Sequence, residues 1–144
     1  MSLDDLYREV ILDHYRMPRN RGKLDGATVV VELANPLCGD EITLYLKVDG
    51  DVVQDVRFDG RGCSISQSSA SMMTEAVKGK SVADALEIAR RFKAMMRSEL
   101  SAVEADLGDL EALQGVAKFP VRIKCAVLSW EALRQGLEGN GTSR

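Results

Sequence analysis

Three apolar runs with a two-residue period, lying between segments of helical periodicity, are the feature that most constrains the fold. They span 29–33, 42–48 and 52–58, and Asp49-Gly50 between the last two is a strong hairpin signal. Alternation at this period is typical of strands that bury one face. The alternating apolar residues are Val29, Val31, Leu33, Ile42, Leu44, Leu46, Val48, Val52, Val56 and Phe58. We therefore expect a small three-stranded antiparallel sheet.

Apolar residues at helical spacing predict the remaining elements. Ser2 with Asp5 and Ser81 with Asp84 fit capping boxes, and Met17-Pro18 should end the first helix. The segment that follows is polar and rich in turn residues, which favours an exposed connection. The expected helical ranges are 2–16, 65–77, 81–100, 109–114 and 125–139. Strands followed by helices predict an α+β fold with the helices packed on one face of the sheet.

Length and composition are those of one globular unit. We expect a single domain over 1–144, with a frayed tail over 139–144. A net charge of −3 argues against a nucleic-acid partner, which needs clustered Lys and Arg. Charged residues interrupt the first fifteen positions, so no secretory signal is expected there, and no apolar run is long enough to span a membrane. The expected location is the cytoplasm, with no membrane partner.

Three cysteines stand at predicted junctions between elements. Cys38 lies in the turn before the second strand, Cys63 follows the third strand, and Cys125 is expected to open the last helix. A helix N-terminus favours a thiolate, the form that binds metals and attacks electrophiles. In a reducing compartment three cysteines do not indicate disulfides. Metal binding, thiol chemistry and plain burial stay open, and burial has about even odds for any one cysteine.

A fourth metal ligand would have to be something other than cysteine. The single histidine, His14, is distant in the sequence and continues an apolar helical stripe, so packing is favoured for it over partner docking. Asp40 is two residues from Cys38 across a glycine, so both side chains can turn toward one point. Arg61, Arg122 and Lys124 could balance the negative charge of such a site, although solvated surface positions are the simpler interpretation.

Four segments give the chain a recognisable pattern. They are LYREVILDHYRMPRNRG, ANPLCGDEI, GRGCSISQSSASMM and VRIKCAVLSWEAL, in this order along nearly the whole sequence. The pattern resembles the U-type (IscU/NifU N-terminal-like) iron–sulfur cluster assembly proteins, in particular their SufU branch. The resemblance implies a SufE/IscU-like α+β fold. It also implies a metal site built from Cys38, Asp40, Cys63 and Cys125.

Three departures separate this chain from the scaffold branch of that family. Lys124 stands where scaffolds usually carry histidine, the proline-rich chaperone motif is absent near VAKFPVRIKC, and the segment between Cys63 and Cys125 is about one helix longer. The resemblance to the SufU branch then implies a zinc-dependent sulfurtransferase. Such a protein accepts persulfide sulfur on Cys38 from a SufS-type, PLP-dependent cysteine desulfurase and passes it to downstream Suf assembly components. Zinc would guard the Cys38 thiolate until the partner supplies a replacement ligand.

Two other functions remain open at this stage. One is a scaffold that transiently assembles an iron–sulfur cluster on Cys38, Asp40, Cys63 and Cys125. The other is a zinc-stabilised binding module without sulfur chemistry. The Met72-Met73 pair is interpreted as core filling rather than as a soft-metal site.

Overall fold

The computed structural model describes residues 3–36 and 39–140 and has the expected α+β architecture. Its sheet has the order β1-β2-β3, and both strand pairs are antiparallel. The elements are α1 (Leu3–Arg16), β1 (Val29–Asn35), β2 (Asp40–Asp49), β3 (Val52–Arg61), α2 (Ser64–Val77), α3 (Val82–Met96), α4 (Ala102–Ala105), the 3₁₀ segment η1 (Gly108–Lys118) and α5 (Pro120–Asn140). No helix in these ranges is long and apolar enough to cross a membrane.

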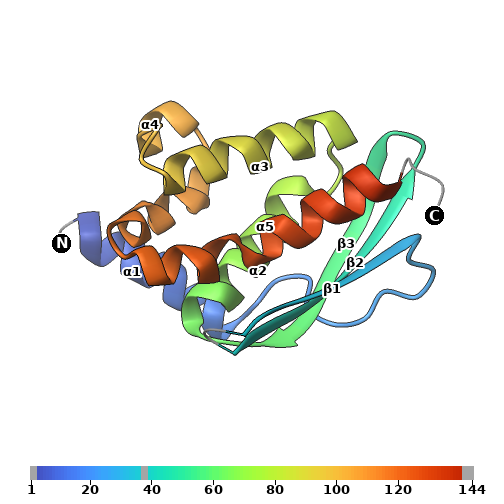
Figure 1. Ribbon diagram of the computed structural model, residues 1–144, viewed down its shortest axis with the longest axis horizontal. Helices are drawn as coiled ribbons and strands as arrows, with labels where there is room; N and C mark the ends of the chain where they lie inside the picture. The colour runs from blue at the N-terminus through green and yellow to red at the C-terminus, as the bar shows by residue number, and fades with distance from the viewer. Residues whose placement is uncertain (1–2, 37–38, 141–144) are drawn as a thin grey trace.

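The helices lie on one face of the sheet, as the sequence predicted (Figure 1). Helix α5 runs across β1 and β2, while α2 contacts β3 and packs beside α5. Gly136 permits this close approach, since a methyl group there would lie 2.7 Å from Leu46 Cδ1. Above the sheet, the rings of Phe92 and Trp130 stack with centroids 4.8 Å apart. The core therefore lies between the sheet and α2, α3 and α5.

A β-bulge in β3 corrects one part of the predicted sheet. Lys47 pairs with Asp55 and Val48 pairs with Val53, which leaves Gln54 as an extra residue. The alternation of buried positions shifts by one at this point. Val53 is fully buried, whereas Val52, expected on the buried side, is 37% exposed.

Helix α2 is buried although its sequence is rich in serine. No charged residue occurs between Gly62 and Thr74. Its hydroxyl groups are bonded internally: Ser69 Oγ donates to the Ala126 carbonyl at 2.6 Å and accepts from Trp130 Nε1 at 3.2 Å. These bonds join α2 to α5 and remove the cost of burying polar groups. The neighbouring Met72 and Met73 are buried in the core, as expected.

His14 is buried on α1 against α2 and η1. Its Nδ1 lies 2.8 Å from Ser71 Oγ, and its Nε2 lies 3.4 Å from Asp109 Oδ2 and 3.9 Å from Glu75 Oε1. The packing interpretation of this histidine is therefore confirmed. Within the first family-like segment, His14 thus holds three helical elements together.

The connection after α1 is less exposed than its polar sequence suggested. The Arg19 backbone N–H donates to Ser71 Oγ at 2.8 Å, and Asn20 Nδ2 donates to Thr74 Oγ1 at 3.0 Å. The Asn20 carbonyl accepts a bond of 3.0 Å from the Phe58 N–H, beside the edge of β3. Asn20 has a φ of 57°, a left-handed conformation that asparagine tolerates. The segment thus fastens α1 to α2 and to the sheet.

The second half of the chain departs from the predicted boundaries. Helix α3 ends at Met96 instead of near Leu100, and the predicted turn over 109–114 is part of the longer η1. The last helix begins at Pro120, five residues before Cys125. Gly139 and Asn140, placed in the expected tail over 139–144, still belong to α5, and residues 141–144 lie outside the described ranges.

Candidate metal centre

Three of the four predicted ligands converge at one end of the sheet. Asp40 is the first residue of β2, Cys63 follows β3 and is the N-cap of α2, and Cys125 lies on α5. One ligand atom from each of them lies within 4.8 Å of the others. Among the residues that the structure describes, this is the only group of three or more His, Cys, Asp or Glu with such a geometry.

The Asp40 side chain bonds to Cys63, another of the predicted metal ligands. Its Oδ1 accepts a bond of 2.9 Å from the Cys63 N–H, and its Oδ2 lies 3.9 Å from Cys63 Sγ. The Asp40 side chain is buried, with 1% of its surface exposed. A buried carboxylate needs a charge or hydrogen-bond partner, and here one of its partners is the backbone N–H of the N-cap residue of α2.

Cys63 and Cys125 differ in their helical positions. Cys63 stands at the N-terminus of α2, as predicted, with an extended backbone (φ −72°, ψ 170°). Cys125 lies in the second turn of α5, so the expectation that it opens that helix is wrong. The helix starts earlier because Pro120 occupies its first position. The fixed φ and missing N–H of proline suit that position. Cys125 is 1% exposed and points toward the other two ligands from the helix flank.

Cys38 lies outside the residues that the structure describes. On either side of the undescribed residues, the Gly39 N–H donates to the Asn35 carbonyl at 2.9 Å. Asn35 pairs with Asp40 at the end of the β1–β2 ladder. Gly39 has a φ of 72°, a conformation that costs glycine little.

The positively charged residues next to these ligands in the sequence are Arg61, Arg122 and Lys124. Arg61 forms an ion pair with Glu41, with Nε 3.1 Å from Oε2. Its side chain is 80% exposed, which agrees with the solvated surface position that was the simpler interpretation of the sequence. Arg122 and Lys124 are exposed on α5, and neither forms an ion pair within the described part of the chain.

The donor set suits a thiophilic divalent ion. Two sulfurs and one carboxylate oxygen are the ligand types found in zinc sites, and a structural zinc site takes four of them. The three described side chains already lie close enough to share one ion. They could hold a metal with one further ligand.

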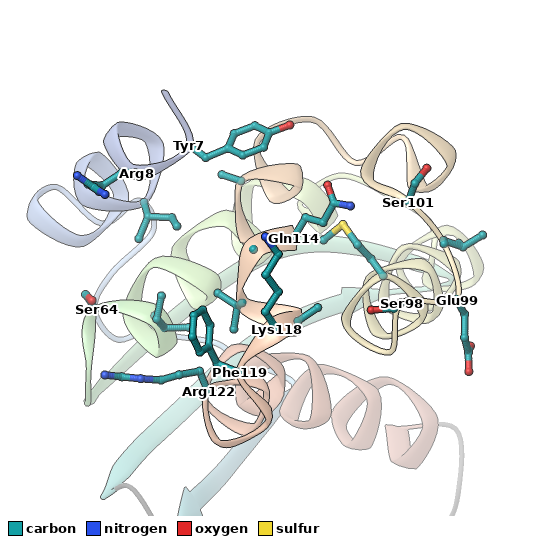
Figure 2. Close-up of a pocket in the computed structure, with 18 of the residues that line it drawn as sticks. Tyr7, Arg8, Ser64, Ser98, Glu99, Ser101, Gln114, Lys118, Phe119 and Arg122 are labelled. Carbon is teal, nitrogen blue, oxygen red and sulfur yellow. The ribbon is translucent and has the colours of Figure 1, made fainter. Parts of the chain in front are cut away.

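A groove is lined at one end by sequence neighbours of two of these ligands. It encloses about 1200 Å³ between α1, η1, the end of α3 and the start of α5. Figure 2 shows Ser64, Phe119 and Arg122 together at one end of this groove, with Tyr7 and Ser101 at the opposite side. Ser64 directly follows Cys63, and Arg122 lies one turn before Cys125, so this end of the groove adjoins the candidate metal centre.

Two residues near the ligands were not singled out from the sequence. Ser66 donates a hydrogen bond of 3.1 Å to the Cys63 carbonyl, and Gly62 approaches both Ser66 and Asp40 closely. The signal in the sequence was the uncharged run after Gly62, which predicts a buried helix start. Which atoms this glycine touches depends on tertiary packing.

Comparison with known proteins gives a consistent set of relatives. The sequence matches the family described as "NifU-like N terminal domain" over residues 6–138. It is 56% identical over 136 residues to the "Zinc-dependent sulfurtransferase SufU" of Bacillus subtilis (strain 168). This alignment covers 94% of this chain and 92% of the relative. It is 44% identical over 143 residues to the "Iron-sulfur cluster assembly scaffold protein IscU" of Streptococcus pyogenes serotype M1, which covers 99% of this chain and 89% of the relative.

Solved structures show the same architecture. One is a crystal structure from the thermophile Fervidobacterium islandicum AW-1, described as a candidate iron–sulfur cluster assembly scaffold protein for the SUF system. It superposes with a TM-score of 0.85 and 36% sequence identity, over 94% of this chain and 99% of that one. The similarity therefore extends over nearly the whole length of both proteins.

Proposed function

Because the chain belongs to the family of NifU-like N-terminal domains, we propose that it is a zinc-dependent sulfur-transfer protein of iron–sulfur cluster assembly. The observation that carries this proposal is the convergence of Asp40, Cys63 and Cys125 within 4.8 Å. The 56% identity to a zinc-dependent sulfurtransferase points to the same activity. Cys38 completes the set as the fourth ligand and the sulfur acceptor.

We propose Cys38 as the acceptor because the fold holds the other two cysteines in place. Cys63 is fixed by hydrogen bonds to its backbone N–H and carbonyl, and Cys125 is buried on the flank of a long helix. Cys38 belongs to a short connection between two strands, next to a glycine. In the transfer step the Cys38 thiolate attacks the terminal sulfur of a persulfide on the donor cysteine. A new S–S bond forms on Cys38, the S–S bond to the donor breaks, and the donor leaves as a thiolate.

A resident Zn²⁺ supplies the positive charge that keeps its ligand thiols deprotonated. The chain itself orients those thiols: Asp40 holds the N-terminus of α2, and α5 fixes the depth of Cys125. We place the protein in the cytoplasm, where reducing conditions keep its three thiols available.

The sulfur donor is proposed to be a PLP-dependent cysteine desulfurase of the SufS type. A donor must cover the surface around the centre in order to reach Cys38. Two exposed apolar residues lie there: Phe119 at the end of the groove and Val121, which is 73% exposed. Val121 lies four residues before Cys125, on the same face of α5. We propose that the desulfurase packs on these two side chains.

A scaffold function is the alternative, favoured by the 44% identity to an IscU protein. A scaffold would hold an iron–sulfur cluster on the same four residues. Lys124, where scaffolds carry histidine, argues against it. Anaerobic reconstitution with iron and sulfide tests this alternative, because a stable visible absorption would favour a scaffold.

The direct test is alanine release by a SufS-type desulfurase supplied with cysteine and a reductant. The zinc-loaded protein and the metal-free protein are added in parallel. We expect strong stimulation by the zinc-loaded form, since a turning-over acceptor removes sulfur from the donor cysteine. Absence of stimulation by the zinc-loaded form would contradict the sulfur-transfer proposal and favour a scaffold or a structural zinc module.

A further inference from the structure

Gly62 occupies the space between two polar side chains of the candidate metal centre. A methyl group on its Cα would collide with Asp40 Oδ1 and with Ser66 Oγ, and it would lie 3.0 Å from Asp40 Cγ. Gly62 is not among the residues with positive φ, so its backbone conformation is open to other residues. A side chain at position 62 would therefore force Asp40 and Ser66 to shift.

Asp40 and Ser66, the two side chains that pack against Gly62, both bond to the backbone of Cys63. Asp40 Oδ1 accepts from the Cys63 N–H at 2.9 Å, and Ser66 Oγ donates to the Cys63 carbonyl at 3.1 Å. Cys63 is thus held on both sides of its Cα, although its own side chain makes no capping bond. Because both peptide groups of Cys63 are held, the Cα and Cβ from which its Sγ projects are held as well.

From this geometry we infer that Gly62 and Ser66 are positioning residues of the metal centre, an inference that rests on the metal site proposed above. Neither residue offers a ligand atom; both act through Asp40 and Cys63. Asp40 and Ser66 are buried, so a side chain at position 62 cannot be accommodated by turning them into solvent. To make room, Asp40 and Ser66 both have to shift, and we expect the Asp40 carboxylate to move away from the Cys63 N–H and from the other ligand atoms.

The test is the zinc affinity of Gly62→Ala, measured by competition with a chromophoric chelator. Residues that orient metal ligands typically change affinity by about tenfold to a hundredfold when mutated, and we expect a loss in this range. Gly115→Ala is the matched control, because a methyl group there meets nothing within 4 Å and its φ is not positive. We expect the control to bind zinc like the wild type. Wild-type affinity in Gly62→Ala would overturn the inference.

Cobalt substitution gives a second readout that does not depend on sulfur transfer. If the Asp40 carboxylate is displaced in Gly62→Ala, the visible absorption of bound Co²⁺ should change while the thiolate charge-transfer bands persist. A cobalt spectrum identical to that of the wild type would contradict the displacement.

A double-variant cycle shows whether Gly62 acts through Asp40. We expect Gly62→Ala to cost much less zinc affinity in an Asp40→Ala background than in the wild type, since the displaced carboxylate is already gone. Equal costs in the two backgrounds would overturn the role assigned to Gly62.

Ser66→Ala keeps the inference testable if Gly62→Ala fails to fold, as judged by circular dichroism of the metal-free form. It removes the side-chain bond to the Cys63 carbonyl, which still accepts from the Gln67 N–H at 3.1 Å, and it adds no atoms; we expect a several-fold loss of zinc affinity. Unchanged affinity in Ser66→Ala would overturn the inference. A wild-type protein that binds no zinc would instead refute the proposed metal site itself, so the two failures are distinguishable.

Discussion

The carboxylate of Asp40, on β2, accepts a 2.9 Å hydrogen bond from the backbone N–H of Cys63, 23 residues further along the chain. This bond ties the first residue of a strand to the N-terminus of the helix that follows the sheet. It brings two metal ligands together through the protein's own hydrogen bonding, before any ion contributes. The centre is in this sense partly organised by the fold.

Asp40 variants separate the structural role of this bond from metal ligation. Asp40→Ala leaves a partly buried N–H without its acceptor, and we expect the metal-free protein to lose about 1–3 kcal/mol of unfolding free energy. Asp40→Asn keeps an acceptor oxygen and should lose less. Both should bind zinc more weakly, because neither supplies a carboxylate. Urea unfolding of the metal-free forms and chelator competition measure the two effects.

Equal stability of metal-free Asp40→Ala and wild type would show that the bond to Cys63 contributes nothing to folding. Unchanged zinc affinity together with unchanged sulfur transfer in both variants would remove Asp40 from the ligand set.

Cys38→Ser should abolish sulfur acceptance. The hydroxyl of serine does not form the S–S bond that holds the transferred sulfur. After incubation with a desulfurase and cysteine, mass spectrometry should find the persulfide on wild-type Cys38 and none on the variant. A persulfide that appears on Cys125 of the variant at the normal rate would defeat this assignment.

The strands were predictable because each buries one face, and periodicity reports that burial directly. The bulge at Gln54 was not, because an extra residue is fixed by the pairing of β2 with β3 and leaves no local pattern. The start of α5 was missed since the apolar period begins only near Cys125, although Pro120 was an available N-terminal signal.

The metal centre was predictable in part for a different reason. Cys63 and Asp40 stand next to predicted element ends, and antiparallel strands bring such ends together. The contact between Gly62 and Asp40 depends on how the start of α2 sits against the first residue of β2, which no sequence period encodes. The family-like motif GRGCSISQSSASMM contains Gly62 and Ser66, but the motif alone gave no physical reason for these two residues.

His14 gives a stability prediction that is independent of the metal. His14→Ala removes the ring that bonds Ser71 and approaches Asp109, and it leaves a cavity between α1, α2 and η1. We expect a loss of about 2–4 kcal/mol in unfolding free energy. Tyr15→Ala, at an exposed neighbouring position, is the control and should stay within about 0.5 kcal/mol of the wild type.

Zinc affinity provides the second measurement on the histidine variant. His14 is not part of the cluster of Asp40, Cys63 and Cys125. The folded His14→Ala protein should therefore bind zinc like the wild type. A large loss of affinity in a folded variant would point to a role for His14 at the metal.

Glu87 contributes a pH dependence on the exposed face of α3. Hydrogen bonds from Arg90 and then from Arg91 lower the pKa of Glu87 from 4.5 to about 2. A carboxyl group whose pKa is lowered by folding stabilises the protein above pH 4.5, and this contribution is lost as the pH falls toward 2. Glu87→Gln should therefore show a smaller loss of stability over that window. The difference should shrink at about 1 M salt, since exposed charges are screened, and equal pH profiles at low salt would contradict it.

Val121 tests the proposed surface for the desulfurase. It is 73% exposed and lies one turn before Cys125 on the same side of α5, so we expect a partner that covers the metal centre to contact it. Val121→Glu should lower the stimulation of alanine release at limiting protein concentration, because a buried charge without a partner is costly at an interface. Zinc affinity should not change. Val30→Glu is the matched control: Val30 is 53% exposed and lies near the opposite end of β1 from Asn35, which pairs with Asp40. Equal stimulation by the two variants would place the partner elsewhere on the surface.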